Sequence, residues 1–425
     1  EITAAGNRLL VQGAVHPTEG TLKRAFDNAK YEGAGAEITE NLDDARVVFG
    51  LKEIELAHIQ ANKTYLCFSH THKGQVKNRK MLKTFMDRKT TLVDYELVTD
   101  ENGARIITAF TYFAGYAGMI DTLWAVGKRL EMEAGAHPFG KVPQSIEKED
   151  LGLIKGMLAD IGAEISANGT PADLPPFINV ILGEGKTSKG SQDIYDILPV
   201  EEIGMADLKT TFESGDRRKV YKCVLGITDM FRLKADAATS AETYAAWSTR
   251  EKESLYFQHP DQFESNLEGV LPYATILMNC ILWAPEFPRT MSRAFTKNMW
   301  AESQTLKAIG DITCDPEGSI EFSKETWIDN PVYIYNPETD TQTDGFEGKG
   351  IAVMAVTNLP CEFSADASEQ FSTDISPLLS GILSANYEGT MEESGLPDAI
   401  SKACILWNGE LTPTYAYMSE FVEGL

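Results

Sequence analysis

A glycine-rich turn between an apolar strand and a helix is the feature that most constrains the fold of this chain. Residues 176–182 are apolar and β-branched, which predicts a buried parallel strand. Residues 191–198 predict a short helix that ends before Pro199. The glycines between them follow the spacing GxGxxxxG rather than GxGxxG. The candidate cofactor-binding residues of this turn are Gly183, Gly185, Lys186 and Gly190.

The order strand, glycine turn, helix is typical of dinucleotide-binding sites. Gly183 permits a tight turn, and Gly185 lets backbone amides approach a pyrophosphate without a Cβ in the way. The amides at the helix N-terminus and the helix dipole both favour an anion. The alternative is an ordinary strand-to-helix turn that happens to be rich in glycine. The context favours dinucleotide binding over that alternative.

Length and charge narrow the class of protein further. A chain of 425 residues is too long for one typical core, so two or three domains are expected. Its 38 basic and 63 acidic side chains give a formal net charge of −25, which disfavours nucleic acids and anionic membranes as partners. Any site for an anionic ligand must therefore be locally basic.

Cysteine usage indicates a reducing compartment, either the cytosol or the mitochondrial matrix. The six cysteines contain no CxxC pair and lie mostly in apolar surroundings, which predicts free thiols and no zinc site. We expect no metal. The apolar stretch 106–127 contains Asp121 and three glycines, so it predicts buried secondary structure rather than a membrane span.

Strand and helix patterns alternate along the chain, which predicts an α/β fold with parallel sheets. The predicted strands are residues 8–12, 46–51, 64–69, 90–96, 105–109, 307–314, 332–335, 351–356 and 403–407. The predicted helices are residues 75–89, 115–133 and 154–165, and residues 234–269 predict an inserted helical loop.

Charged side chains follow three of these strands at the points where the strands end. Lys52 and Glu53 follow one strand, His70 and Lys73 follow the next, and Glu96 ends a third. Because carboxyl ends of parallel strands face the ligand crevice of an α/β sheet, a lysine and a histidine could share one cleft there. That pair suits the proton transfers of imine or carbonyl chemistry. The alternative is a set of solvated loops, with the acids acting as helix caps.

The ordered set of short motifs resembles one enzyme family. The motifs include Phe68-Ser-His-Thr-His-Lys73 and Asp311-Ile-Thr-Cys-Asp-Pro-Glu-Gly-Ser. The others lie at residues 50–53, 93–96, 113–118, 218–221, 279–283 and 358–360. Together they are similar to the lysine-ketoglutarate reductase half of bifunctional aminoadipic semialdehyde synthases. They resemble the lysine-forming saccharopine dehydrogenases less closely, within a superfamily that includes alanine dehydrogenase and transhydrogenase.

The resemblance implies two Rossmann-like domains with parallel sheets that flank a central cleft. It places a substrate domain at residues 1–130, a dinucleotide-binding domain at 131–325, and a return to the substrate domain at 326–425. The implied activity is saccharopine dehydrogenase (NADP+, L-lysine-forming), the NADPH-dependent reductive condensation of L-lysine and 2-oxoglutarate to saccharopine. Fusion to a saccharopine-oxidising domain and a homo-oligomer are further expectations. The family's arginine-rich opening segment is expected to precede this chain.

The resemblance also assigns roles to individual residues. Lys52 and His70 match the acid–base pair, and Glu53 and Glu96 match carboxylates that receive the lysine substrate. Lys73 matches a lysine of the cleft. Asn279 and Asp315 match positions beside the coenzyme, although a turn-stabilising role is the alternative for Asp315.

The preference for NADPH rests on a count from the glycine turn. In NAD-specific folds an acid about 20 residues past the first glycine binds the ribose hydroxyls. Here the strand predicted at 200–203 ends at Gly204, so a glycine stands where that acid would be. Arg217 and Arg218 could then bind the 2′-phosphate. The alternative is that Glu201 or Glu202 binds the ribose, which would favour NADH. An NAD-dependent saccharopine dehydrogenase, an alanine-type dehydrogenase and a catalytically impaired nucleotide-binding regulatory domain stay open as other functions.

Overall fold

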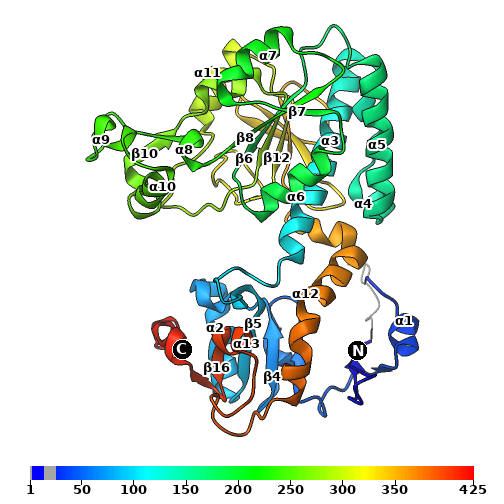
Figure 1. The fold of residues 1–425 in the computed structure, drawn as a ribbon, viewed down its shortest axis with the longest axis vertical. Coiled ribbons are helices and arrows are strands. Elements are labelled where there is room, and N and C mark those ends of the chain that lie inside the picture. Colours follow the sequence, from blue (N-terminus) through cyan, green and yellow to red (C-terminus); the bar gives the residue numbers. More distant parts are fainter. Residues whose placement is uncertain (1, 14–24) are drawn as a thin grey trace. The chain divides into compact units, whose positions relative to one another are not determined.

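The computed structural model describes residues 2–13 and 25–425 (Figure 1). The chain divides into two compact units, one formed by residues 1–109 and 368–425 and the other by residues 110–367. Each unit has its own sheet and core. The first unit is therefore discontinuous in sequence, since its C-terminal part returns to it after the second unit is complete.

The first unit is built on a five-stranded sheet of order β17-β16-β5-β4-β3. Its parallel strands are β3 (Val47–Phe49), β4 (Thr64–Cys67) and β5 (Thr91–Asp94). β16 (Cys404–Trp407) pairs antiparallel with β5, and the edge strand β17 (Glu410–Leu411) pairs antiparallel with β16. Helix α2 (Val76–Asp87) connects β4 to β5 and buries Met81, Leu82 and Phe85. The smaller elements are β1 (Leu10–Val11), α1 (Asn28–Gly33), β2 (Glu37–Ile38), α13 (Asp398–Lys402) and α14 (Ser419–Val422).

The second unit is built on an eight-stranded sheet of order β14-β13-β15-β12-β11-β6-β8-β7. Six strands are parallel: β6 (Ile178–Leu182), β7 (Val200–Glu202), β8 (Val220–Leu225), β11 (Ile276–Asn279), β12 (Ala308–Asp311) and β15 (Ile351–Met354). At one edge β13 (Val332–Asn336) and β14 (Thr341–Asp344) extend the sheet in antiparallel fashion.

Helices cover both faces of this sheet (Figure 1). On one face pack α3 (Ala109–Ala134), α5 (Leu151–Asn168) and α6 (Lys186–Tyr195). On the other face pack α7 (Leu208–Ser214) and α11 (Arg293–Glu302). The sheet is apolar on both sides, as expected for parallel strands buried between helix layers. The remaining elements are α4 (Ser145–Lys148), α8 (Ile227–Met230), β9 (Phe231–Leu233), α9 (Ala241–Ala245), α10 (Thr249–Gln258), β10 (Phe263–Ser265) and α12 (Ser364–Ser384).

The fold class is confirmed, since both units are α/β with mostly parallel sheets. The unit borders at 109/110 and 367/368 differ from the expected borders at 130 and 325. Helix α3 continues without a break across residue 130, and residues 326–367 supply three strands to the second sheet. The functional names of the two domains and the cleft between them stay predictions.

Two local predictions are wrong. The strand expected at 105–109 is absent, because Arg105 makes only an isolated bridge with Thr99 and Ala109 already begins α3. The helix expected from residue 191 begins five residues earlier, directly after Gly185. Across the described part of the chain, helices that combine the length and the apolar character needed to cross a bilayer are not found.

Candidate active site

The carboxyl edge of the first unit's sheet gathers the charged side chains that the sequence predicted there. Strands β3, β4 and β5 are parallel neighbours, and they end at Phe49, Cys67 and Asp94. Parallel strands end at the same edge of a sheet, so the loops after them are neighbours too. These loops carry Lys52 and Glu53, His70 and Lys73, and Glu96.

Glu53 and His70 form a hydrogen-bonded pair. Nδ1 of His70 lies 2.9 Å from Oε1 of Glu53, and both side chains are partly buried. Because a carboxylate can only accept, the imidazole carries its proton on Nδ1 and leaves the lone pair of Nε2 available as a base. Burial works to raise the pKa of the Glu53 carboxyl, but the His70 hydrogen bond and neighbouring charges outweigh it and lower that pKa. Glu53 therefore stays ionised beside the imidazole.

Asp94 holds the loop that carries His70. The Asp94 carboxylate is fully buried, and Oδ2 accepts hydrogen bonds from the amides of Ser69 and His70 at 3.0 Å and from the Ser69 hydroxyl at 2.6 Å. Burial would raise the pKa of Asp94, but the nearby His72 imidazole and the hydrogen bonds from Ser69 and the Glu96 amide lower it. His70 has a φ of +51°, a left-handed conformation that is strained for a residue with a side chain. The Asp94 contacts stabilise that conformation.

Glu96 is surrounded by positive groups. Its carboxylate lies 2.8 Å from Nζ of Lys73 and 3.1 Å from the guanidinium of Arg105. Nε2 of His72 lies 3.5 Å away, and Nδ1 of His72 lies 3.6 Å from Asp94. Burial would raise the pKa of Glu96, but the Lys73 hydrogen bond and the charges of Lys73, Arg105 and His72 lower it.

Donor atoms of His72, Asp94 and Glu96 lie within 4.8 Å of one another, which is a spacing that could hold a metal ion. Two cations already bind the Glu96 carboxylate, so the arrangement suits an internal charge network better than a metal site.

Lys52 is placed differently from its expected partners. Its side chain is exposed, and within the described residues it makes no hydrogen bond or ion pair. The structure thus joins Glu53 to His70 and Lys73 to Glu96, and it leaves Lys52 at the same edge without a contact to either pair.

The sequence analysis gave no role to two polar residues of this network, His72 and Arg105, whereas Asp94 was expected with Glu96 at the end of the third strand. His72 lies in the same short motif as His70, Asp94 ends the strand before Glu96, and Arg105 lies in a segment assigned to a strand. The alternation of charged residues in Ser69–Lys73 was the available signal for His72. Nothing in the sequence indicated that Arg105 would reach Glu96.

The glycine turn of the second unit lies between β6 and α6. Gly183 has a φ of +95°, and a Cβ there would lie 3.2 Å from the Cys280 carbonyl oxygen, so a glycine is required. Gly185 is the N-cap of α6 and provides no side-chain cap, while the space that its Cβ would occupy is open. Lys186 is the first residue of α6. A ten-residue helix that begins at an uncapped glycine fits the phosphates of a dinucleotide.

Gly190 has a packing role instead of a phosphate contact. It lies inside α6, where a Cβ would come within 2.4 Å of the Tyr112 carbonyl oxygen in α3. The absence of a side chain lets α6 and α3 approach closely. The third glycine of dinucleotide-binding turns likewise permits close packing, in that case of the helix against a strand.

The order of strands places the turn at a switch point. β6 lies between β8, which follows it in the chain, and β11, which comes after the inserted segment. The chain passes from β6 to β7 and β8 on one side of β6 and then crosses over to β11 on the other side. Ligands of open α/β sheets bind outside the carboxyl ends of strands at such points.

Beside this turn, the ends of β11 and β12 form a buried polar cluster. Nδ2 of Asn279 donates to Asp311 and to the Ser319 hydroxyl, both at 2.8 Å, and Ser323 also donates to Asp311. Oδ1 of Asn279 is buried without a hydrogen-bond partner among the described residues. An orphaned acceptor at this edge fits a ligand that donates hydrogen bonds, such as a carboxamide. Desolvation, followed by the charges of Asp311 and Glu325, raises the pKa of Asp315, although this residue is exposed overall.

The prediction that Arg217 and Arg218 bind a coenzyme phosphate is wrong. Both precede β8, at the amino edge of the sheet, whereas Gly183 follows the carboxyl end of β6. Five residues of parallel strand separate the two edges, roughly 16 Å at about 3.3 Å per residue. Arg217 donates instead to the Pro171 carbonyl oxygen at 3.0 Å.

Gly204 is also the wrong strand end for the ribose. β7 is the edge strand, and β8 is the neighbour of β6, so the ribose corner lies at the end of β8. There Gly226 follows Leu225, and its amide donates to Asp229 at 3.1 Å. A Cβ on Gly226 would lie 2.6 Å from Oε2 of Glu184, so the Glu184 carboxylate also lies at this corner.

These features define an α/β protein with a Rossmann-type sheet and a second, discontinuous α/β unit, the architecture of pyridine-nucleotide dehydrogenases. Residues 2–117 match the N-terminal domain of the alanine dehydrogenase/PNT family. Two solved structures share the fold. An L-alanine dehydrogenase matches with a TM-score of 0.59 at 17% identity, over 99% of this chain and 93% of that one. A transhydrogenase from Sinorhizobium meliloti matches with a TM-score of 0.55 at 13% identity, over 97% and 93%.

Curated relatives confirm the more specific resemblance. The chain is 33% identical to an alpha-aminoadipic semialdehyde synthase of Arabidopsis thaliana, over 93% of this chain and 37% of that protein. It is 30% identical to the mitochondrial alpha-aminoadipic semialdehyde synthase of Rattus norvegicus, over 99% and 45%. A saccharopine dehydrogenase [NAD(+), L-lysine-forming] of Neurospora crassa is 22% identical over 87% and 84%. The chain thus spans less than half the length of the two synthases.

Proposed function

We propose that this chain is an oxidoreductase of lysine metabolism that condenses L-lysine with 2-oxoglutarate and reduces the product to saccharopine. The observation that carries the proposal is the Glu53–His70 pair, at a strand end within a chain that is 33% identical to an aminoadipic semialdehyde synthase. A base held by a carboxylate is what the first chemical step needs.

The proposed reaction begins with a proton transfer to His70. The substrate ε-ammonium gives a proton to Nε2, and the neutral amine attacks the keto carbon to form a carbon–nitrogen bond. Glu53 stabilises the imidazolium that results, because its carboxylate accepts from Nδ1 at 2.9 Å. The imidazolium then returns the proton to the carbinolamine hydroxyl, which leaves as water and yields an iminium. A reduced nicotinamide dinucleotide, when bound, supplies the hydride that converts the iminium to a secondary amine.

The charged residues around Glu96 are proposed to hold the substrates. Lys73 and Arg105 are cations at the sheet edge, and a substrate carboxylate can share their hydrogen bonds with Glu96. Glu96 in turn attracts the ammonium groups of lysine. Lys52, exposed at the same edge, is the proposed second proton donor, and its free side chain can reach a substrate without breaking an internal pair.

The dinucleotide is proposed to bind the glycine turn of the second unit. Gly183, Gly185 and Lys186 would hold the pyrophosphate, and Asn279 and Asp315 would lie beside the nicotinamide ring. Support comes from the uncapped start of α6 and from the orphaned Oδ1 of Asn279.

NADPH is the coenzyme that we propose, with a modest preference over NADH. The residue at the end of β8 is Gly226, so no carboxylate occupies the position from which an acid binds ribose hydroxyls. Glu184 and Asp229 lie beside it, and their charges oppose a 2′-phosphate. An exposed charge at contact is worth about 1 kcal/mol, so we expect less than a tenfold difference in kcat/KM. A higher kcat/KM for NADH would contradict this proposal.

The reductase proposal is tested by NADPH absorbance in the presence of L-lysine and 2-oxoglutarate. We expect His70→Gln to lower kcat by about 10²–10⁴-fold, since that is the usual contribution of one acid–base group. His58→Gln is the matched control, because His58 is an exposed histidine of the same unit. Dinucleotide binding without turnover would favour a regulatory domain, and turnover of pyruvate with ammonia would favour an alanine-type dehydrogenase.

Three wider statements belong to the same proposal. We propose a reducing compartment, the cytosol or the mitochondrial matrix, because all six cysteines are unpaired and four of them are buried. We also propose fusion to a saccharopine-oxidising domain and assembly into a homo-oligomer. An immunoblot of the native gene product and light scattering of the purified protein test these two statements.

A further inference from the structure

Two adjoining cavities lie at the amino edge of the second unit's sheet, opposite the glycine turn. One is an apolar cavity of about 260 Å³ and the other is a polar cavity of about 340 Å³. Phe177, Thr275, Lys307 and Gly350 come directly before β6, β11, β12 and β15, which places both cavities at the ends where these strands begin. Gln304 and Lys307 line both cavities, so the two share a border.

The polar cavity is rich in hydrogen-bond donors. Its charged lining consists of Arg129, Lys307, Lys349 and a single acid, Glu133. Glu133 pairs with Arg129 at 2.7 Å and with Lys307 at 2.6 Å, and Lys349 pairs outside the lining with Glu338. The lining thus carries three cations and one carboxylate. This local excess of positive charge is opposite in sign to the net charge of the whole protein, which is −25.

Two donors of this lining lack partners. Nε of Arg129 and Nε1 of Trp300 are buried, and neither has a hydrogen-bond partner among the described residues. Both side chains are at least nine-tenths buried, with Trp300 at 3% exposure and the Arg129 side chain at 5%. A buried donor without an acceptor costs free energy, and an acceptor of negative charge would satisfy both.

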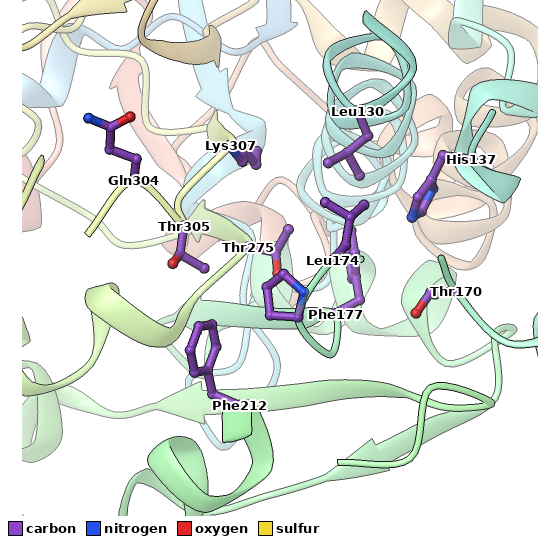
Figure 2. Close-up of a pocket in the computed structure, with 11 residues that line it drawn as sticks. Leu130, His137, Thr170, Leu174, Phe177, Phe212, Thr275, Gln304, Thr305 and Lys307 are labelled. Carbon is purple, nitrogen blue, oxygen red and sulfur yellow. The ribbon is translucent and has the colours of Figure 1, made fainter. Parts of the chain in front are cut away.

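The apolar cavity is suited to a hydrocarbon group. Leu130, Leu174, Phe177 and Phe212 contribute apolar side chains to its wall. Figure 2 shows Gln304 and Lys307 on one side of it and His137 and Thr170 on the other. His137 is buried and its pKa is lowered by that burial to about 4, so it adds no charge at neutral pH. A cavity of about 150 Å³ accommodates benzene in another protein, so this one has room for an aromatic ring.

We propose that the two cavities together bind a small amphipathic carboxylate, with its carboxylate in the polar cavity and its apolar group in the other. Arg129, Trp300 and Lys307 would donate to the carboxylate oxygens, while Leu174 and Phe212 would enclose the apolar part. Both cavities lie wholly within residues 110–367, at the opposite sheet edge from Gly183. The site is therefore separate from the proposed coenzyme site, and it does not depend on the proposed reaction.

Isothermal titration calorimetry of the full chain with 3-phenylpropionate tests this site. The matched ligands are 3-phenylpropionamide, which lacks the charge, and propionate, which lacks the ring. We expect 3-phenylpropionate to bind at least about tenfold more tightly than either, since a hydrogen bond to a charged group and a buried ring each contribute that much. NADPH should not displace it. Absence of binding, or equal affinity for the amide, would overturn the proposal.

Variants locate the site. Trp300→Phe removes one unpaired donor and keeps a ring, and Lys307→Gln removes a cation that is partly exposed. We expect each to weaken binding of 3-phenylpropionate by about tenfold. Lys141→Met is the control, because Lys141 pairs with a single glutamate in the same way as Lys307 but lies outside both cavities. If both site variants bind as tightly as the control, the assigned residues are wrong.

Discussion

Replacing Glu362 by glutamine is expected to stabilise the unit of residues 110–367 at neutral and alkaline pH. Glu362 in the 3₁₀ turn Leu359–Phe363 and Asp121 in α3 are both fully buried. Their carboxyl groups influence each other's pKa, and two buried carboxyl groups that interact cannot both ionise without a large cost, so we infer that they share a proton. Oδ1 of Asp121 also accepts from the Ser145 amide at 2.8 Å, and among the described residues no cation pairs with either carboxyl group.

The size and sign of the effect follow from the pKa of Asp121. Burial raises that pKa from 3.8 to about 6, and burial together with the Asp121 charge raises the pKa of Glu362 as well. A raised carboxyl pKa gives stability that is present at acidic pH and is lost as the pH rises through the folded-state value. A shift of about two units corresponds to about 3 kcal/mol at 1.36 kcal/mol per unit, and we expect a measured effect of about 1–3 kcal/mol.

Glu362→Gln removes the shared proton, because the amide can donate to an ionised Asp121. The wild type should therefore lose more stability than the variant between pH 5 and pH 8, because the variant keeps only the buried Asp121 as a titrating group of this pair. Each kcal/mol of difference corresponds to about 2–4 °C in Tm. Thermal unfolding at the two pH values measures this difference, with Glu347→Gln as an exposed control. An unchanged pH dependence in Glu362→Gln, or a variant that is less stable than the wild type at pH 8, would refute the reasoning.

Two further predictions test the second unit. Glu184→Gln should raise the ratio of kcat/KM for NADPH to that for NADH by about fivefold, because it removes a carboxylate charge at the proposed ribose corner. Glu213→Gln is the control, because the Glu213 side chain in α7 is exposed. An unchanged ratio would place the ribose elsewhere. Gly190→Ala should destabilise the protein by about 1–3 kcal/mol, because the new Cβ would lie 2.4 Å from the Tyr112 carbonyl oxygen. Gly156→Ala is the control and should not destabilise the protein, because a Cβ there has no atom within 4 Å. Urea unfolding measures both, and equal midpoints would contradict the packing role of Gly190.

The strand ends that carry charged side chains could be predicted from the sequence. Each of β3, β4 and β5 is a largely apolar run with charged side chains no more than three residues past its end, and the parallel arrangement then brings these ends to one edge. Which side chains pair there could not be predicted. The contact of His70 with Glu53, and of Arg105 with Glu96, depends on loop conformations such as the left-handed backbone of His70.

The error at Gly204 has a topological cause. Counting strands from the glycine turn assumes that the second strand lies beside the first, but here the third strand, β8, is inserted between them. The sequence contains a signal for this order. β7 is three residues long and ends in two exposed glutamates, as suits an edge strand, whereas β8 is buried over most of its length.

The acids of the candidate active site differ in how a substrate could use them. Glu53 keeps one partner, His70, at hydrogen-bond distance, with Lys77 no closer than 4.0 Å. We therefore propose that Glu53 orients a base rather than binding a substrate amine, which differs from the role that the resemblance implied. Glu96 already receives Lys73 and Arg105, so an incoming ammonium exchanges one cation for another on that carboxylate. The cations that it displaces become available to a substrate carboxylate. Binding of a substrate that carries both charges, as lysine and saccharopine do, thus preserves the balance of charge at this partly buried edge, while a ligand of one charge would leave an unpaired group behind.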